Sequence, residues 1–337
     1  MANLTTEYMG LKLKNPIIVG ASSLTANLQT IREIENSGAS ALVAKSLFEE
    51  QIQLERYQDE LVRESVNERH AEMITVFPEM KDIGPNEHLY WLKKTKEIVK
   101  IPVIGSLNAV TKEIWFDYAQ RMAETGIDGL ELNFYSVPKD FSISGASIEE
   151  EQIQILKELT SKLTIPISVK LSSNYTNPLH VIKEMSKTGI AGLVIFNRFF
   201  QPDINIDTLQ HSFPFNLSRP QDNRTTLRYT GLLSQEINTN ICSSGGIFNA
   251  SDVIKMILAG ADAVQIVSVL YRHGISHINK ILSDLEAWMD KKGFDSISDF
   301  QASMNRKNSK DPWAYTRAQY AKLLMKPHLL KKDPQDI

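Results

Sequence analysis

The sequence predicts a (β/α)8 TIM barrel, an α/β fold, on the strength of three observations. Eight short apolar runs alternate with amphipathic helical segments along the 337 residues. The runs are almost continuously hydrophobic, which is typical of parallel strands buried on both faces. A doubly wound sheet is the alternative, but no GxGxxG turn follows the first run and the units continue without a break in composition.

The expected strands and helices follow one another in regular order. The strands begin at Pro16, Ala41, Pro102, Gly129, Pro166, Gly192, Asn240 and Ala263. One expected helix opens at Ser147, with Glu150 three residues later, which is a capping-box pattern. Another begins with Asn249 or Ser251 as its cap and ends at Gly260.

The segments outside these units also have expected places. Residues 4–16 read as a short N-terminal β-hairpin that closes the bottom of the barrel. Two long segments, 48–85 and 199–223, follow the second and sixth strands, so we expect them on the face where barrel active sites form. Residues 1–325 are expected to form a single (β/α)8 barrel domain, and residues 326–337 a frayed tail.

Composition narrows the function classes. The net charge of -3 and the scattered lysines and arginines give no reason to expect nucleic acid or an anionic membrane as a partner. No apolar run reaches the ~20 residues that span a bilayer, and the first ten residues lack a signal-peptide pattern. The single cysteine, Cys242, excludes an intrachain disulfide or an iron–sulfur cluster held by this chain alone. No metal site is expected, and the cytoplasm is the expected location.

Polar residues gather at the carboxyl ends of the expected strands, where barrel chemistry takes place. Two of them, Lys45 and Lys170, are lysines in apolar surroundings, and a buried ammonium needs an anion or a strong acceptor. A structural ion pair explains either lysine alone equally well, whereas one shared ligand would satisfy both lysines and the asparagines together. The full set of strand-end residues is Ala21, Ser22, Ser23, Lys45, Ser46, Ser106, Asn108, Asn133, Ser136, Lys170, Asn197, Arg198, Val267 and Ser268.

A glycine-rich turn follows the seventh strand. Ser244, Gly245 and Gly246 lead from this strand into the next helix, and such turns let backbone N–H groups approach an anion. The eighth strand ends nearby at Val267 and Ser268, and phosphate sites built from the last two strands recur in this fold. A plain turn is the alternative, and the neighbouring strand end favours phosphate.

These residues together resemble the FMN-dependent dihydroorotate dehydrogenases, especially the soluble class 1 branch. The similarity runs from about Leu11 to Gly274. The matching stretches include "LKNPIIVGASS", "GASALVAKSL", "IPISVKLS", "LSRPQDNRTTLR" and "SSGGIFNASDVIKMILAGADAVQIVSVLYRHG".

The resemblance implies an FMN site and a substrate site at the barrel mouth. It implies that Lys170 lies by flavin N1 and the C2 carbonyl, where its charge stabilises the reduced flavin. The residues it implies for FMN are Ala21, Ser22, Lys45, Ser46, Asn108, Asn133, Lys170, Asn197, Ser218, Ser244, Gly245, Gly246, Val267 and Ser268. For the substrate they are Lys45, Asn133, Asn197 and Arg198.

The resemblance also implies a catalytic base at Ser136, working together with Lys170. Class 1 members usually carry cysteine at this position, whereas serine is similar to the membrane-linked class 2 enzymes. A serine hydroxyl is a poor base and needs a relay or a polarising neighbour. A structural role in the loop is the alternative for Ser136.

Three departures from the family pattern concern the substrate half of the site. Pro138 replaces an asparagine, and Arg198 replaces a small residue, so that it binds a carboxylate or blocks the pocket. The asparagine-rich loop that grips orotate in the family has no clean match here, with Asn86 as the nearest stand-in.

The resulting function hypothesis is oxidation of dihydroorotate to orotate, a step of pyrimidine biosynthesis. The alternatives are an FMN oxidoreductase acting on a different pyrimidine or unsaturated acid, and a non-catalytic barrel that binds phosphate ligands. Fumarate, a quinone or a separate electron-transfer subunit remain open as the electron acceptor. Family members of this type are often dimers, so a homodimer is an expectation of the resemblance.

Overall fold

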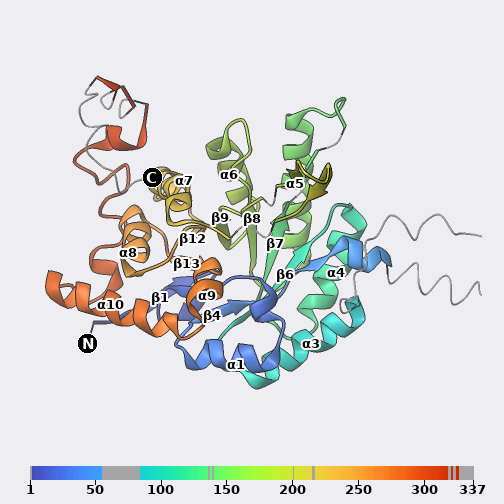
Figure 1. The fold of residues 1–337 in the computed structure, drawn as a ribbon, viewed down its shortest axis with the longest axis horizontal. Helices are drawn as coiled ribbons and strands as arrows, with labels where there is room; N and C mark the ends of the chain where they lie inside the picture. The colour runs from blue at the N-terminus through green and yellow to red at the C-terminus, as the bar shows by residue number, and fades with distance from the viewer. Residues whose placement is uncertain are drawn as a thin grey trace, which may run out of the picture.

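The computed structural model describes residues 2–54, 84–135, 137–138, 140–199, 201–214, 217–317, 320–321 and 324–325. Eight parallel strands form a closed barrel, because β4 pairs with both β3 and β6 and so joins the two ends of the sheet. This confirms the predicted (β/α)8 barrel (Figure 1). In barrel order the strands are β4 (Ala41–Val43), β3 (Ile17–Val19), β13 (Ala263–Ile266), β12 (Asn240–Ser244), β9 (Gly192–Ile195), β8 (Ile167–Leu171), β7 (Gly129–Phe134) and β6 (Val103–Asn108).

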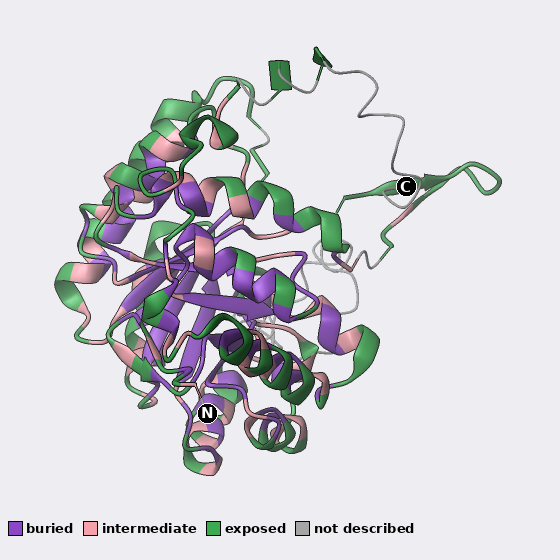
Figure 2. Cartoon of the chain, turned by 90° about the vertical axis from the view of Figure 1, so that its left-hand side faces the viewer, coloured by how far each residue is buried: buried purple, intermediate pink, exposed green. Residues whose placement is uncertain are grey.

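Helices cover the outside of the barrel. They are α1 (Leu28–Asn36), α3 (Pro85–Ile98), α4 (Lys112–Ala123), α5 (Gly145–Lys162), α6 (Pro178–Ser186), α7 (Asn223–Leu233), α8 (Ala250–Ala259), α9 (Ser268–His273) and α10 (His277–Lys292). The eight barrel strands are buried, apart from the half-buried ends of β12, while the helices expose their outer faces (Figure 2). The apolar faces of the helices pack toward the core, α10 on α8 and α9.

Two apolar layers hold this arrangement together. The larger lies between the strands and the helices and includes Leu42, Leu132 and Trp115. The smaller fills the inside of the barrel and includes Val43 and Cys242. Because successive strand residues point to opposite sides, each strand serves both layers.

The N-terminal hairpin closes the bottom of the barrel, as predicted. Its strands are β1 (Thr6–Tyr8) and β2 (Leu11–Leu13), which pair antiparallel. Tyr8 and Met9 pack so closely on Gly192 that a Cβ built there would lie 2.7 Å from the Tyr8 hydroxyl and from Met9 Cγ. The hairpin thus leaves the other end of the barrel as the mouth.

The two long segments both follow strands at the mouth. After β4 the chain adds β5 (Leu47–Phe48), which pairs with β6. After β9 it forms an exposed antiparallel hairpin of β10 (Asp203–Asn205) and β11 (Gln210–Ser212). The 3-10 turns are η1 (Ser23–Thr25), η3 (Pro220–Asp222), η4 (Ile297–Asp299) and η5 (Pro312–Tyr315). The expected tail, 326–337, lies outside the described residues.

The helix boundaries follow the capping rules, with one prediction wrong. Helix α8 begins after Asn249, whose side chain accepts a hydrogen bond from the Asp252 N–H, and ends at Gly260 in the left-handed conformation. Helix α5, however, begins after Ser144, whose side chain accepts a hydrogen bond from the Ser147 N–H. The predicted start at Ser147 was wrong because both serines are competent caps and the earlier one adds a turn of helix.

Candidate functional site

Three asparagines meet at the barrel mouth. Asn108 ends β6 and Asn133 lies near the end of β7, while Asn197 follows β9. Asn197 Nδ2 donates to Asn133 Oδ1 at 2.7 Å, and Asn108 Nδ2 donates to the Asn133 backbone carbonyl at 3.2 Å. Asn108 and Asn133 are buried. Hydrogen bonds therefore join the three asparagines in one cluster.

Lys170 lies between the asparagine-bearing strands. Its Cα pairs in register with that of Asn133, and the residue is 8% exposed. The ammonium donates to Gln265 Oε1 at 3.0 Å and lies 3.8 Å from Glu131 Oε1. A buried ammonium thus has an acceptor and a counter-charge inside the barrel, beside the polar mouth.

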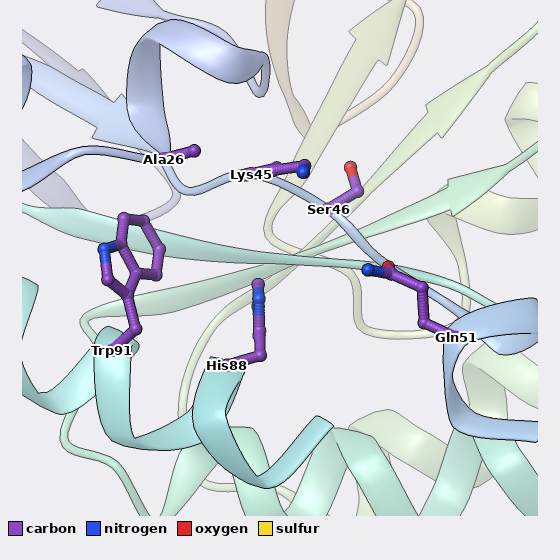
Figure 3. A pocket seen from close by; sticks show the side chains of 6 residues that line it. All are labelled: Ala26, Lys45, Ser46, Gln51, His88 and Trp91. Carbon is purple, nitrogen blue, oxygen red and sulfur yellow. The ribbon is translucent and has the colours of Figure 1, made fainter. Parts of the chain in front are cut away.

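Lys45 and Ser46 lie in the segment that follows β4. Figure 3 shows them with Gln51 around a small cavity, facing His88 and Trp91 of α3. The cavity measures about 10 Å³, which is close to the space of one water molecule. Its lining does not include Lys170 or Asn133, so the two lysines have different immediate surroundings.

The same cavity has an unusual histidine. Burial, and after it the positive charge of Lys45, lowers the pKa of His88 to about 4. The Nε2 atom of His88 and the indole N–H of Trp91 are buried without hydrogen-bond partners among the described residues. His88 is therefore neutral at pH 7 and presents a polar nitrogen beside the Lys45 side chain.

The glycine turn after β12 packs tightly against α7. Gly245 and Gly246 have φ of +91° and +68°. A Cβ built at Gly246 would lie 2.4 Å from the Asn223 backbone nitrogen. Asn223 Nδ2 in turn donates to the Gly246 carbonyl at 3.2 Å. The positive φ favours glycine at both positions, and the clash with the Asn223 backbone requires it at Gly246.

The neighbouring loop after β13 meets the segment that precedes α7. Strands β12 and β13 pair in parallel, with Ser244 opposite Gln265, so their two following loops lie side by side. The Ser218 N–H donates to Ser268 Oγ at 2.9 Å, and Val267 caps α9. The expected phosphate-binding residues therefore lie together at one sector of the mouth.

The loop after β3 adds one further polar group. Ala21 and Ser22 are half-buried there. The Ser22 hydroxyl oxygen is buried and has no hydrogen-bond partner among the described residues. A buried hydroxyl without a protein partner is the kind of group that a bound ligand satisfies.

The substrate-side expectations have mixed outcomes. Arg198 forms an ion pair with Asp222, the last residue of η3, rather than standing as an unengaged cation. Asn86 accepts from Arg121 on the exposed side of α3 and α4. Ser136 lies outside the described residues. Pro138 is exposed.

Glu131, Gln265 and His88 belong to the surroundings of the predicted residues and were missed. Glu131 comes two positions before Asn133, and Gln265 two before Val267, so each points into the barrel like its partner. That alternation was the available signal. His88 follows residues 55–83, which are not described. The sequence around it has no strand alternation that would have predicted its position.

No cluster of three or more histidine, cysteine or acidic side chains suited to a metal ion occurs among the described residues. Within the same part of the chain no helix has the length and apolar character to cross a bilayer.

Known proteins resemble the chain over most of its length. The dihydroorotate dehydrogenase family model matches residues 3–289. The catalytic subunit of dihydroorotate dehydrogenase B (NAD(+)) from Thermoplasma acidophilum is 29% identical over 303 residues, which cover 89% of this chain and 98% of the relative. The same subunit from Anoxybacillus flavithermus is 27% identical, covering 89% and 95%. Dihydroorotate dehydrogenase A (fumarate) from Limosilactobacillus reuteri is 27% identical, covering 88% and 96%.

Proposed function

The chain belongs to the dihydroorotate dehydrogenase family, whose members are flavin-dependent oxidoreductases, and from this premise we propose that it oxidises dihydroorotate to orotate with FMN. The observation that carries the proposal is the joint position of Lys170 and the three asparagines at one barrel mouth. Ligand sites in this fold lie at that end.

The donor set fits an FMN. The Gly245–Gly246 turn offers backbone N–H groups to a phosphate, with Ser268 beside it. The buried Ser22 hydroxyl and the mouth asparagines offer polar groups to the rest of the cofactor. FMN, when bound, supplies a ring that accepts a hydride at N5.

Lys170 has the electrostatic role in this proposal. Its ammonium carries a fixed positive charge inside a low-dielectric barrel, near the proposed position of flavin N1. A bound FMN would gain negative charge on reduction, and this pre-oriented cation would stabilise that charge without reorganisation. Glu131 and Gln265 keep the ammonium in place.

Substrate binding and proton removal fall to the other side of the mouth. Lys45, Asn133 and Asn197 would bind the substrate, with the asparagine amides held by their mutual hydrogen bond. Ser136 would remove the substrate proton, and its hydroxyl needs a polarising neighbour to do so.

A second candidate is an FMN oxidoreductase for a different pyrimidine or unsaturated acid. The Arg198–Asp222 ion pair favours it, because the cation at this substrate-side position is engaged by the chain itself. Pro138 and the absence of the family's asparagine-rich loop point in the same direction.

Anaerobic titration of the purified protein with dihydroorotate distinguishes the two candidates. We expect the visible flavin absorbance to bleach at about one equivalent per bound FMN, and then to recover with an electron acceptor. The relatives' names carry NAD(+) and fumarate, so both acceptors are added in separate arms. A flavin that dithionite bleaches but dihydroorotate does not would contradict the dihydroorotate assignment and support the second candidate.

A further inference from the structure

A carboxylate is buried in the middle of the barrel. Glu131 lies on β7, two residues below Asn133, and is 1% exposed. Acidic side chains are almost never buried to this degree unless they are paired. Its presence in an interior otherwise filled by residues such as Ile104, Val194 and Cys242 therefore needs an explanation.

Glu131 is connected to Lys170 through a glutamine. Gln265 Nε2 donates to Glu131 Oε2, and Gln265 Oε1 accepts from the Lys170 ammonium at 3.0 Å. Gln265 comes from β13, which is separated from β8 by β9 and β12, so the bridge crosses the barrel interior. The amide can serve both ends only in this orientation, because its N–H₂ faces the carboxylate and its oxygen faces the ammonium.

The Lys170 ammonium and the Glu131 carboxylate form an ion pair but no direct hydrogen bond. Glu131 Oε1 lies 3.8 Å from Lys170 Nζ, and this oxygen has no hydrogen-bond partner among the described residues. The arrangement keeps the carboxylate close enough to act on the ammonium electrostatically, and both residues are buried. Charges interact strongly at this distance away from water.

A thiol and a phenol near the pair stay neutral at pH 7. Burial, with the negative charge of Glu131 as a further cause, raises the pKa of the Cys242 thiol well above its usual range. Burial, with Cys242 and Glu131 as further causes, does the same to the Tyr8 hydroxyl. Asp262 acts on both groups as well, from a largely buried position in which burial raises the pKa of its carboxyl.

We propose that the buried carboxylate of Glu131, held by Gln265 beside the Lys170 ammonium, lowers the reduction potential of the bound flavin through its own negative charge. The inference rests on the proposed function, because it takes FMN to lie against Lys170. An ammonium alone stabilises the reduced, negatively charged flavin. A buried carboxylate behind that ammonium opposes the stabilisation, so the pair sets an intermediate potential instead of the high one that an isolated lysine would give.

The test is the flavin midpoint potential of matched variants, measured against a reference dye during slow anaerobic reduction. Glu131→Gln keeps the shape and removes the charge. We expect it to favour the reduced flavin about tenfold, which is a rise of about 30 mV for a two-electron couple. Glu131→Asp keeps the charge. We expect the equilibrium constant between its oxidised and reduced flavin to stay within about threefold of the wild-type value.

A second pair guards against a variant that fails to fold. Lys170→Met is compared with Lys170→Met/Glu131→Gln, in which both charges are absent and no buried ion is left unpaired. The loss of the carboxylate should again raise the potential. A rise in either pair, with Glu131→Asp close to wild type, supports the inference.

The contrary outcomes separate the two claims. Wild-type protein that does not bind FMN would overturn the proposed function and this inference with it. FMN-loaded variants whose potentials are equal within each pair would overturn the inference and leave the proposed function intact. A rise in Glu131→Asp as large as in Glu131→Gln would overturn it too, since side-chain shape would then be the cause.

Discussion

Asn197 donates a 2.7 Å hydrogen bond to the side-chain oxygen of Asn133, and the two residues come from strands on either side of β8. Lys170 lies on that middle strand, in register with Asn133. The Asn197 N–H also donates to the carbonyl of Leu171, the next residue of β8. Two amides and an ammonium are therefore fixed in one sector by the barrel backbone, before any ligand binds.

Removing the central amide should impair turnover without unfolding the barrel. We expect Asn133→Ala to lower kcat/KM for dihydroorotate by about 10- to 100-fold, because a hydrogen bond in such a site contributes about 1.5–3 kcal/mol when a charged group takes part. Dye-coupled steady-state kinetics measure it. Asn279→Ala, on the exposed side of α10, is the control and should match wild type. Full activity in Asn133→Ala would show that this amide takes no part.

Removing the buried ammonium should destabilise the protein. Lys170→Met leaves the Glu131 carboxylate without its counter-charge, and we expect a loss of about 3–5 kcal/mol in the free energy of unfolding. Urea denaturation measures it. Adding Glu131→Gln should recover most of the loss, while Lys187→Met, at an exposed ion pair on the surface, should change stability by less than about 1 kcal/mol. Equal losses in the single and double variants would refute the ion-pair account.

The glycine turn after β12 offers a matched pair of substitutions. Gly246 and Gly126 both have positive φ, but a Cβ at Gly246 meets the Asn223 backbone whereas one at Gly126 meets nothing within 4 Å. Both alanine variants carry the left-handed strain of about 1 kcal/mol. Only Gly246→Ala should weaken FMN binding, by tenfold or more, in a fluorescence titration of the apoprotein. Equal affinities in the two variants would argue against a phosphate site at this turn.

His88 should make stability depend on pH. Its pKa in the folded protein is about 4, below the usual 6.5, so the unfolded chain binds a proton first as the pH falls. Neutral His88 therefore makes its full contribution to the free energy of unfolding above about pH 6.5. This contribution, about 3 kcal/mol, is lost as the pH drops toward 4. Titration of the Glu and Asp residues should change the free energy of unfolding equally in all variants. The difference between wild type and His88→Gln therefore isolates the contribution of His88.

The matched control for this pH dependence is His180→Gln, because His180 is exposed. Its unfolding free energy should follow the wild-type pH profile, whereas that of His88→Gln should fall about 3 kcal/mol less between pH 7 and pH 4. Parallel profiles for all three proteins would mean that His88 titrates normally in the folded state.

Ser136 is testable by the rate of flavin reduction. Ser136 is the proposed base, so Ser136→Ala should slow the reduction of the flavin by dihydroorotate about 10²- to 10⁴-fold, which is the usual contribution of a positioned base. FMN affinity should be unchanged. Ser161→Ala, on α5, is the control. Stopped-flow traces that overlay the wild type would assign proton removal to another group.

The barrel was predictable from sequence because each unit repeats the same local pattern. The eight apolar runs all became strands, and Asn249 and Gly260 delimit α8 as their capping preferences predict. The start of α5 was missed by local competition between Ser144 and Ser147, which only the folded backbone resolves.

The site was predictable where it depends on strand ends and not where it depends on long-range contacts. Asn133 and Lys170 are neighbours because strand register makes them so. The bridge from Lys170 to Gln265 spans 95 positions, and the Arg198–Asp222 pair depends on the path of an irregular segment. Neither contact leaves a local pattern in the sequence.

The central claim is that this barrel mouth holds FMN, and the most direct test is a titration of apoprotein with FMN followed by flavin fluorescence and the visible spectrum. The account predicts saturable binding of one FMN per chain, with affinity reduced in Gly246→Ala but retained in Gly126→Ala. A correctly folded protein that binds no FMN at micromolar concentrations would contradict it.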